Sequence, residues 1–242
     1  MVRLLLRLIL VLLVLLIAAL GLFRYLAEQR ETADISAAPA AGARVETPSL
    51  TFFTQSAGPT DATPVLLAHG TAAWSGFWAR EVALLGDAGY RAIAFDMPPF
   101  GYTDRPTNRD YSRPLQAKRI LDLARTQAQR PIMVAHSFGA AAATEAVLRD
   151  PRSFAGLIIV DGAIGMGTTP PSDLPVPLQP RLLREAALSA TATNPLATKL
   201  LLKQLIHQKG AATDDLVEIL QQPQTRMGTT PAYADWLPSL LA

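Results

Sequence analysis

The chain has 242 residues, half of them hydrophobic, with a formal net charge of +2 and no cysteine. This length is sufficient for one sizeable domain with an insertion, and the lack of cysteine excludes disulfide bonds and thiolate metal sites. Because the charge is small and no stretch is densely basic, we expect no nucleic-acid partner.

Residues 1–24 are predicted to form a transmembrane signal-anchor helix. Residues 8–23 carry no charge, and with the leucines just before them the span 4–23 forms about 30 Å of helix, which matches the hydrocarbon core of a lipid bilayer. A cleavable signal peptide is the alternative, since Arg3 and Arg7 form a basic N-terminal region, but the apolar run passes its best cleavage site and favours an anchor. The basic residues place the N-terminus inside, which predicts a single-pass membrane protein whose globular part is extracytoplasmic, either periplasmic or extracellular.

The rest of the chain divides into four segments. Residues 25–43 lack an apolar period and are predicted to be a linker. Residues 44–163 alternate short apolar strands with helical segments, a pattern typical of an α/β fold with a mostly parallel sheet and helices on both faces. Residues 164–230 begin with many prolines and continue with three predicted helices, and residues 231–242 predict a helix that returns to the core.

The stretch Pro131–Gly139 carries the strongest functional signal. Residues 132–134 predict a buried strand, and the alanine-rich segment after Gly139 predicts a helix. Ser137 lies at this turn, with the small residues Ala135 and Gly139 two positions before and after it. Small flanking residues permit a sharp turn that exposes the serine hydroxyl beside N–H groups that favour an anion. The alternative is an ordinary strand–helix junction that contains a serine.

This turn resembles the G-x-S-x-G nucleophile turn of the α/β-hydrolase family, with Ala135 in place of the first glycine. Two further motifs carry the resemblance, which covers residues 44–242. His69, Gly70 and Thr71 follow a buried strand, as in the family's His-Gly loop. Residues 96–104 resemble the family's D-x-P-G-x-G-x-S loop, with proline in place of its first glycine.

The resemblance implies a serine hydrolase whose helical cap is formed by residues 164–230. Ser137 would be the nucleophile, and the N–H groups of Thr71 and Phe138 would form the oxyanion hole. The substrate would be a small-molecule ester or acyl compound, with neither a metal nor an organic cofactor. Serine at this position argues against dehalogenase and epoxide-hydrolase chemistry, for which the family uses aspartate. We interpret His69 and Asp96 as residues that order their loops.

The general base and its acid partner are harder to identify. In this fold the acid and then the histidine follow the serine along the chain. Asp161, at the end of a predicted strand, is a candidate acid. His207 is the sole histidine after Ser137, but the leucines around it predict a side chain at the end of a cap helix instead of a base. The two strands that usually carry acid and base do not occur before Ala242, so we expect a chain truncated before its last two core strands.

These observations predict a membrane-anchored serine hydrolase, esterase-like or lipase-like, with weak or no hydrolysis because the catalytic histidine and usual acid are absent. A non-catalytic α/β-hydrolase-like binding or scaffold protein at the membrane is the alternative, and a perhydrolase reaction at the same residues stays open. The lipid bilayer, contacted through residues 4–23, is the second expected partner. Leu196, Leu200 and Leu205 weakly favour a lipophilic acyl group, although we expect them to form the cap's own core.

Overall fold

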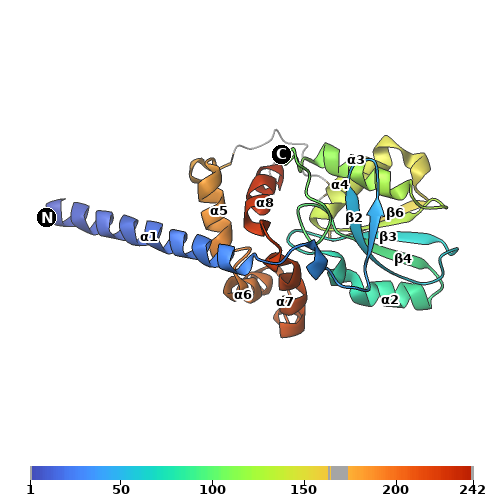
Figure 1. Cartoon of the computed structure of the whole chain (residues 1–242), viewed down its shortest axis with the longest axis horizontal. Helices are drawn as coiled ribbons and strands as arrows, with labels where there is room; N and C mark the ends of the chain where they lie inside the picture. Colours follow the sequence, from blue (N-terminus) through green and yellow to red (C-terminus); the bar gives the residue numbers. More distant parts are fainter. Residues whose placement is uncertain (1, 163, 165–173, 241–242) are drawn as a thin grey trace.

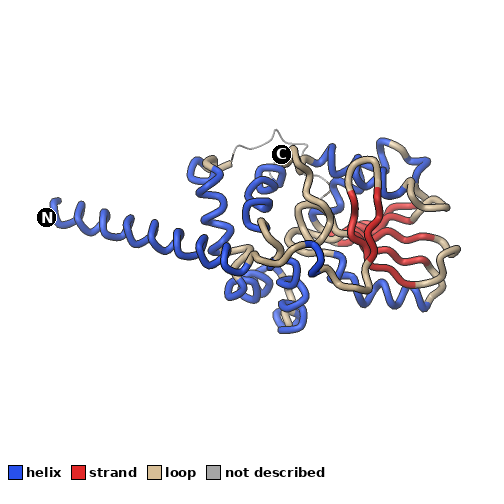
Figure 2. The backbone as a smooth tube through the Cα atoms, viewed as in Figure 1, coloured by secondary structure: helices blue, strands red, loops and turns tan. Residues whose placement is uncertain are grey.

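The computed structural model describes residues 2–162, 164 and 174–240. A six-stranded sheet, of order β1-β2-β4-β3-β5-β6, lies toward one end of the molecule (Figure 2). The strands from β3 onward pair in parallel, and β1 and β2 are antiparallel, so the predicted mostly parallel sheet is confirmed. Its strands are β1 (Ala43–Glu46), β2 (Thr51–Ala57), β3 (Pro64–Ala68), β4 (Arg91–Phe95), β5 (Ile132–His136) and β6 (Gly156–Val160).

Helices cover both faces of this sheet, as the sequence predicts (Figure 1). The covering helices are α2 (Ala79–Asp87) on one face and α3 (Arg113–Ala124) and α4 (Phe138–Arg149) on the other. Alternation along β3 divides the core, because Leu66 and Ala68 pack on the side of α3 and α4, and Val65 and Leu67 pack on the side of α2. Both faces are therefore buried, which explains why these strands are nearly continuous apolar runs.

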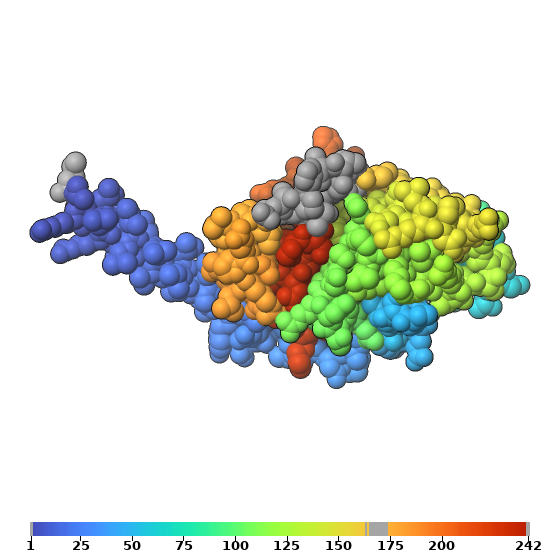
Figure 3. Space-filling model, turned by 90° about the horizontal axis from the view of Figure 1, so that it is seen from above, coloured from blue at the N-terminus to red at the C-terminus, as the bar shows by residue number. Residues whose placement is uncertain are grey.

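The remaining helices form a separate layer beyond one end of the sheet (Figure 1). They are α5 (Arg181–Ala190), α6 (Pro195–Leu205), α7 (Asp214–Gln221) and α8 (Thr229–Trp236). The three helices predicted for the cap are present, and Thr213 caps α7 as expected, since its side-chain oxygen accepts a hydrogen bond from the Leu216 N–H at 3.2 Å. In Figure 3, α8 lies between α5 and the core loops.

The N-terminal helix continues past residue 24, where the prediction ends it. Helix α1 runs from Val2 to Arg30, so the first part of the predicted 25–43 linker is helical. Ala27 is fully buried, and the backbone of Ala33 bonds to that of Thr225 and Met227. Residues 25–43 have no apolar period because only a few of them contact the cap. Of the helices that the structure describes, α1 alone is long and apolar enough to cross a membrane, with mean hydropathy 3.0.

Candidate active site

Ser137 occupies the turn between β5 and α4, where the sequence places the nucleophile. Its φ and ψ are 49° and −123°, a conformation that a non-glycine residue adopts only when its surroundings hold it there. The residue is half-buried, so its hydroxyl is not sealed in the core. It immediately precedes α4, whose first N–H groups have no acceptor within the helix. The predicted sharp turn is therefore present in the structure.

Two glycines allow the neighbouring loop to approach this turn. A Cβ on Gly139 would lie 2.5 Å from the carbonyl oxygen of His69, which is far closer than a carbon atom can approach. A Cβ on Gly70 would lie 2.9 Å from the Ser137 Cβ and 3.0 Å from His136 Nδ1. The loop that follows β3 thus packs directly against the serine turn, and only residues without a side chain permit this contact.

A cavity of about 550 Å³ opens at this turn, a volume within the usual range for small-molecule sites. The core contributes Ser137, Asp161 and the loop residues Gly70 and Thr71 to its wall, and the cap contributes six residues. The cap residues are mostly apolar: Leu202, Leu205, Ile206, His207, Leu216 and Leu220. Ala73, Phe77 and His136 complete the lining. The cavity therefore places a serine hydroxyl and a carboxylate in a mostly apolar space between core and cap.

His69 and Asp96 connect the loops below the cavity. His69 is buried, with Nδ1 2.8 Å from the Gly70 carbonyl oxygen and Nε2 accepting the Met97 N–H at 2.8 Å. Burial lowers the pKa of His69 to about 4, so the imidazole is neutral at physiological pH. The Asp96 carboxylate accepts the N–H groups of Ser75 and Tyr102, both at 2.6 Å, and burial raises its pKa to about 6. Both side chains thus fix loop positions through hydrogen bonds.

Replacing His69 with phenylalanine should destabilise the protein less at pH 4 than at pH 7. The unfolded chain takes up a proton on this imidazole below its ordinary pKa of 6.5, whereas the folded chain does so only near pH 4. The stability that neutral His69 contributes is thus present above pH 6.5 and lost as the pH falls toward 4. We expect the difference in unfolding free energy between the two proteins to narrow by about 3 kcal/mol. Urea unfolding in detergent micelles measures this difference. If the difference in unfolding free energy between the two proteins is the same at pH 4 and pH 7, a buried neutral His69 is excluded.

The other predicted site residues lie around the same turn. Thr71 and Asp161 line the cavity with Ser137, and Asp161 has φ of 45° directly after β6. Phe138 places its N–H at the first position of α4, while its ring packs edge-on against Trp236 at 5.3 Å. Thr71 and Phe138 thus flank the turn on the two segments from which the predicted oxyanion hole would be built. The assignment of each role remains a prediction.

Sequence reasoning missed the position of His207. This residue follows the end of α6, as the leucine pattern indicates, but it also lines the cavity that contains Ser137 and Asp161. Burial lowers the pKa of His136, and the nearby Asp161 carboxylate offsets part of this effect. In the described part of the chain, which includes all three histidines, no hydrogen bond joins an imidazole to the Ser137 hydroxyl. The described residues also contain no group of three or more His, Asp or Glu side chains placed to hold a metal ion.

The expectation for the cap leucines was wrong. Leu196, Leu200 and Leu205 do not form a cap core, because they are 89%, 62% and 83% exposed. Of the aromatic residues after β3, Phe77 lines the cavity, whereas Trp74 and Trp78 are buried in the core. Helical periodicity places residues on one face of a helix but does not show which face another segment covers.

Comparison with known proteins supports the fold. The alpha/beta hydrolase fold family matches residues 63–199, more than half of the chain. A haloalkane dehalogenase from Psychrobacter cryohalolentis is 46% identical over 56 residues, which are 23% of this chain and 18% of that protein. An epoxide hydrolase from Caballeronia sordidicola is 34% identical over 110 residues, 44% of this chain and 32% of that protein. The chain therefore spans about a third or less of the length of these curated relatives.

A solved structure shows the same architecture. The Cif epoxide hydrolase from Acinetobacter nosocomialis superposes with a TM-score of 0.69 at 17% identity, covering 90% of this chain and 72% of that one. At this identity the likeness concerns the fold alone. Together with the family match and the serine turn between β5 and α4, it shows that the chain belongs to the α/β-hydrolase fold family.

Proposed function

We propose that the chain is a membrane-anchored serine hydrolase of the esterase or lipase type. The observation that carries this proposal is the strained backbone of Ser137, whose φ of 49° sets a half-buried hydroxyl at the wall of a 550 Å³ cavity. Strain of this kind persists only where the surrounding structure maintains it, and it is concentrated at functional sites. Serine at this position also distinguishes the chain from the family's aspartate-dependent dehalogenases and epoxide hydrolases.

In the proposed reaction the Ser137 oxygen attacks the carbonyl carbon of an ester. The hydroxyl proton passes to a base, the alcohol leaves, and water then releases the acid from the acyl-enzyme. The N–H groups of Phe138 and Thr71 stabilise the negative oxygen that forms during attack, an effect typically worth about 3 kcal/mol. Asp161 is the candidate acid, because it lines the same cavity as Ser137.

The identity of the base limits how active the chain can be. His69 is unsuited because it is buried and both of its ring nitrogens already have hydrogen-bond partners. His136 stacks on Phe77 with ring centroids 5.4 Å apart and precedes Ser137 in the turn. His207 shares the cavity but is exposed at the end of α6. Since no imidazole is bonded to the Ser137 hydroxyl among the described residues, we expect slow hydrolysis.

The lack of an imidazole bonded to Ser137 among the described residues also favours a second candidate function, that of a non-catalytic binding protein at the membrane. Such a protein would use the same cavity to hold a lipophilic acyl compound without cleaving it. The mostly apolar cap residues around the cavity support a lipophilic acyl compound as the ligand, whether the chain is a hydrolase or a binding protein.

Helix α1 supports the proposed anchorage, and the basic residues Arg3 and Arg7 at its start support a globular part outside the cytoplasm. Its residues ahead of the cap are exposed and apolar, and in water such a surface would be unfavourable. A signal sequence shares these features, so cleavage is tested separately by measuring the N-terminus of the membrane-extracted protein.

Reaction class can be tested with the full chain reconstituted in liposomes. We expect release of p-nitrophenol from medium-chain esters, with neither halide release from haloalkanes nor diol formation from epoxides. A His207→Ala variant should keep its ester activity to within about twofold of the parent chain, because the exposed imidazole is not bonded to the serine. Saturable binding of the ester without turnover would favour the binding protein, and halide or diol formation would contradict a serine hydrolase.

A further inference from the structure

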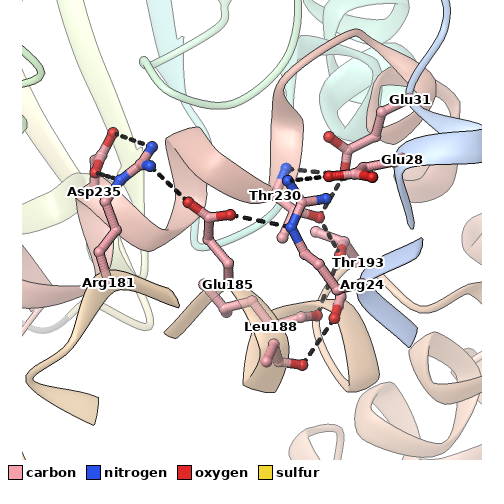
Figure 4. Close-up of polar contacts among 11 residues, drawn as sticks. Arg24, Glu28, Glu31, Arg181, Glu185, Leu188, Thr193, Thr230 and Asp235 are labelled. Carbon is pink, nitrogen blue, oxygen red and sulfur yellow. Dashed lines mark hydrogen bonds and ion pairs between the residues drawn. The ribbon is translucent and has the colours of Figure 1, made fainter. Parts of the chain in front are cut away.

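The cap is joined to the membrane-proximal end of α1 by a network of charged side chains (Figure 4). The Arg24 guanidinium donates to the Glu185 carboxylate at 3.0 Å, and Glu185 also pairs with Arg181 at 2.7 Å. Arg181 in turn bonds to Asp235 of α8 at 2.7 Å. Because Glu185 is almost fully buried and Arg24 is mostly buried, the Arg24–Glu185 pair is partly shielded from water and from salt, whereas Arg181 is 39% exposed. The network therefore links α1, α5 and α8 into one unit.

Two further contacts fix the end of α1 on the cap. Arg30 donates to the Thr193 carbonyl oxygen at 3.1 Å, and the buried Glu31 carboxylate accepts both the N–H and the hydroxyl of Thr230. Four positions over two helical turns, Arg24, Ala27, Arg30 and Glu31, are thus held by contacts or burial. The direction in which α1 leaves the globular part is set by this docking.

The docking brings the cap close to the bilayer surface. If residues 4–23 cross the hydrocarbon core, Arg24 lies at the headgroups, and Glu31 lies only about 10 Å farther along the helix axis. Helix α5 packs beside this part of α1 in both Figure 1 and Figure 3, whereas the sheet lies at the far end of the molecule. The parts of the protein nearest to the lipid are therefore the first helices of the cap.

These helices carry exposed leucines. On α5, Leu182 and Leu183 are 76% and 44% exposed. On α6, Leu196, Leu200 and Leu205 are exposed as well, and Leu205 also lines the active-site cavity. Single exposed leucines are common, but Leu196 and Leu200 lie one turn apart on the same side of α6, and such a pair suits an apolar neighbour.

We propose that the exposed leucines Leu182 of α5 and Leu196 and Leu200 of α6 lie in the interfacial layer of the bilayer that α1 crosses. Their partner is phospholipid, because α1 and the Arg24 network hold this side of the cap at headgroup level. Leucine side chains of interfacial helices enter the boundary between headgroups and acyl chains by about 5–10 Å. The inference rests on the membrane anchorage in the proposed function, and it extends that function by placing α6, whose Leu205 lines the cavity, next to the lipid.

Spin labels can test this contact because the chain has no cysteine. Single variants Leu182→Cys, Leu196→Cys and Leu200→Cys carry a nitroxide in liposomes of phosphatidylcholine and phosphatidylglycerol. Leu148→Cys on α4, 75% exposed, is the matched control, and Leu12→Cys reports insertion of α1. We expect the cap labels to be several-fold more accessible to oxygen relative to a nickel chelate than the Leu148 label. Cap labels that match Leu148 while Leu12 is in lipid would overturn the inference and leave the anchor intact.

A water-exposed label at Leu12 would overturn both the anchor and the inference, whereas ester hydrolysis by Ser137 is measured independently.

The Arg24 network has its own test in Glu185→Gln, compared with Glu28→Gln, which alters an exposed pair of the same arginine. We expect Glu185→Gln to move the Leu196 label toward water-like accessibility while the Leu12 label stays in lipid. No change in the Leu196 label would contradict a role for the network in holding the cap on the membrane.

Discussion

Replacing Ser137 with alanine is expected to reduce any ester hydrolysis by the chain to the uncatalysed rate, a loss of about a thousandfold or more in kcat/KM. The alanine cannot form the acyl-enzyme, and no other described serine or threonine hydroxyl combines a strained turn, a helix N-terminus and this cavity. The free energy of unfolding should change little or increase slightly, because the substitution removes one hydroxyl from a half-buried position. Initial rates with p-nitrophenyl esters, measured at equal concentrations of folded protein, check the prediction.

Ser56→Ala is the matched control for this experiment. Ser56 is exposed on β2, so its loss should leave kcat/KM unchanged. If Ser137→Ala kept more than about a tenth of the activity, hydrolysis would have to proceed through another group, and the proposed nucleophile would be wrong.

Gly139→Ala is expected to lower kcat/KM by about a hundredfold through geometry alone. The new methyl group would lie 2.5 Å from the His69 carbonyl oxygen, so the loop that carries Gly70 and Thr71 must move away from Ser137. A displacement of about 1 Å between catalytic groups is sufficient for an effect of this size. Overpacking of this kind should also cost about 1–3 kcal/mol of unfolding free energy. Ester kinetics and urea unfolding of the same preparation separate the two effects.

Gly156→Ala provides the corresponding control, because a Cβ at this position of β6 meets no atom within 4 Å. We expect it to retain full activity and to be as stable as the parent chain or slightly more stable. Equal activity losses in the two variants would show that the glycine contact with the His69 loop does not position the site.

The sheet and its covering helices could be predicted from the sequence because their signals are local. Buried parallel strands such as residues 132–136 are short apolar runs, and the helix that starts at Phe138 is rich in alanine. The sharp turn at Ser137 could be predicted for the same reason, since strand, serine and helix lie within one short stretch. Its flanking residue Gly139 was correctly expected to be required by close backbone contact.

The positions of the cap helices and of the end of α1 could not be predicted, because they depend on contacts between distant segments. Arg24 and Glu185 are 161 residues apart, and nothing near either residue indicates the pairing. The leucine pattern of α6 correctly predicted a helix, but an exposed apolar face and a core-facing one have the same period. His207 was placed at the helix end for a sound local reason, while its position on the cavity wall depends on how the whole cap sits over the core.

The central claim is that Ser137 is a reactive nucleophile beside an oxyanion-binding turn, and a fluorophosphonate probe tests it most directly. The full chain in liposomes is treated with the probe, digested and analysed by mass spectrometry, next to Ser137→Ala and a heat-unfolded sample. We predict that the phosphonyl mass is found on the peptide containing Ser137 and in neither of the two controls. A folded chain that remains unlabelled, or one labelled equally in Ser137→Ala, would contradict the account.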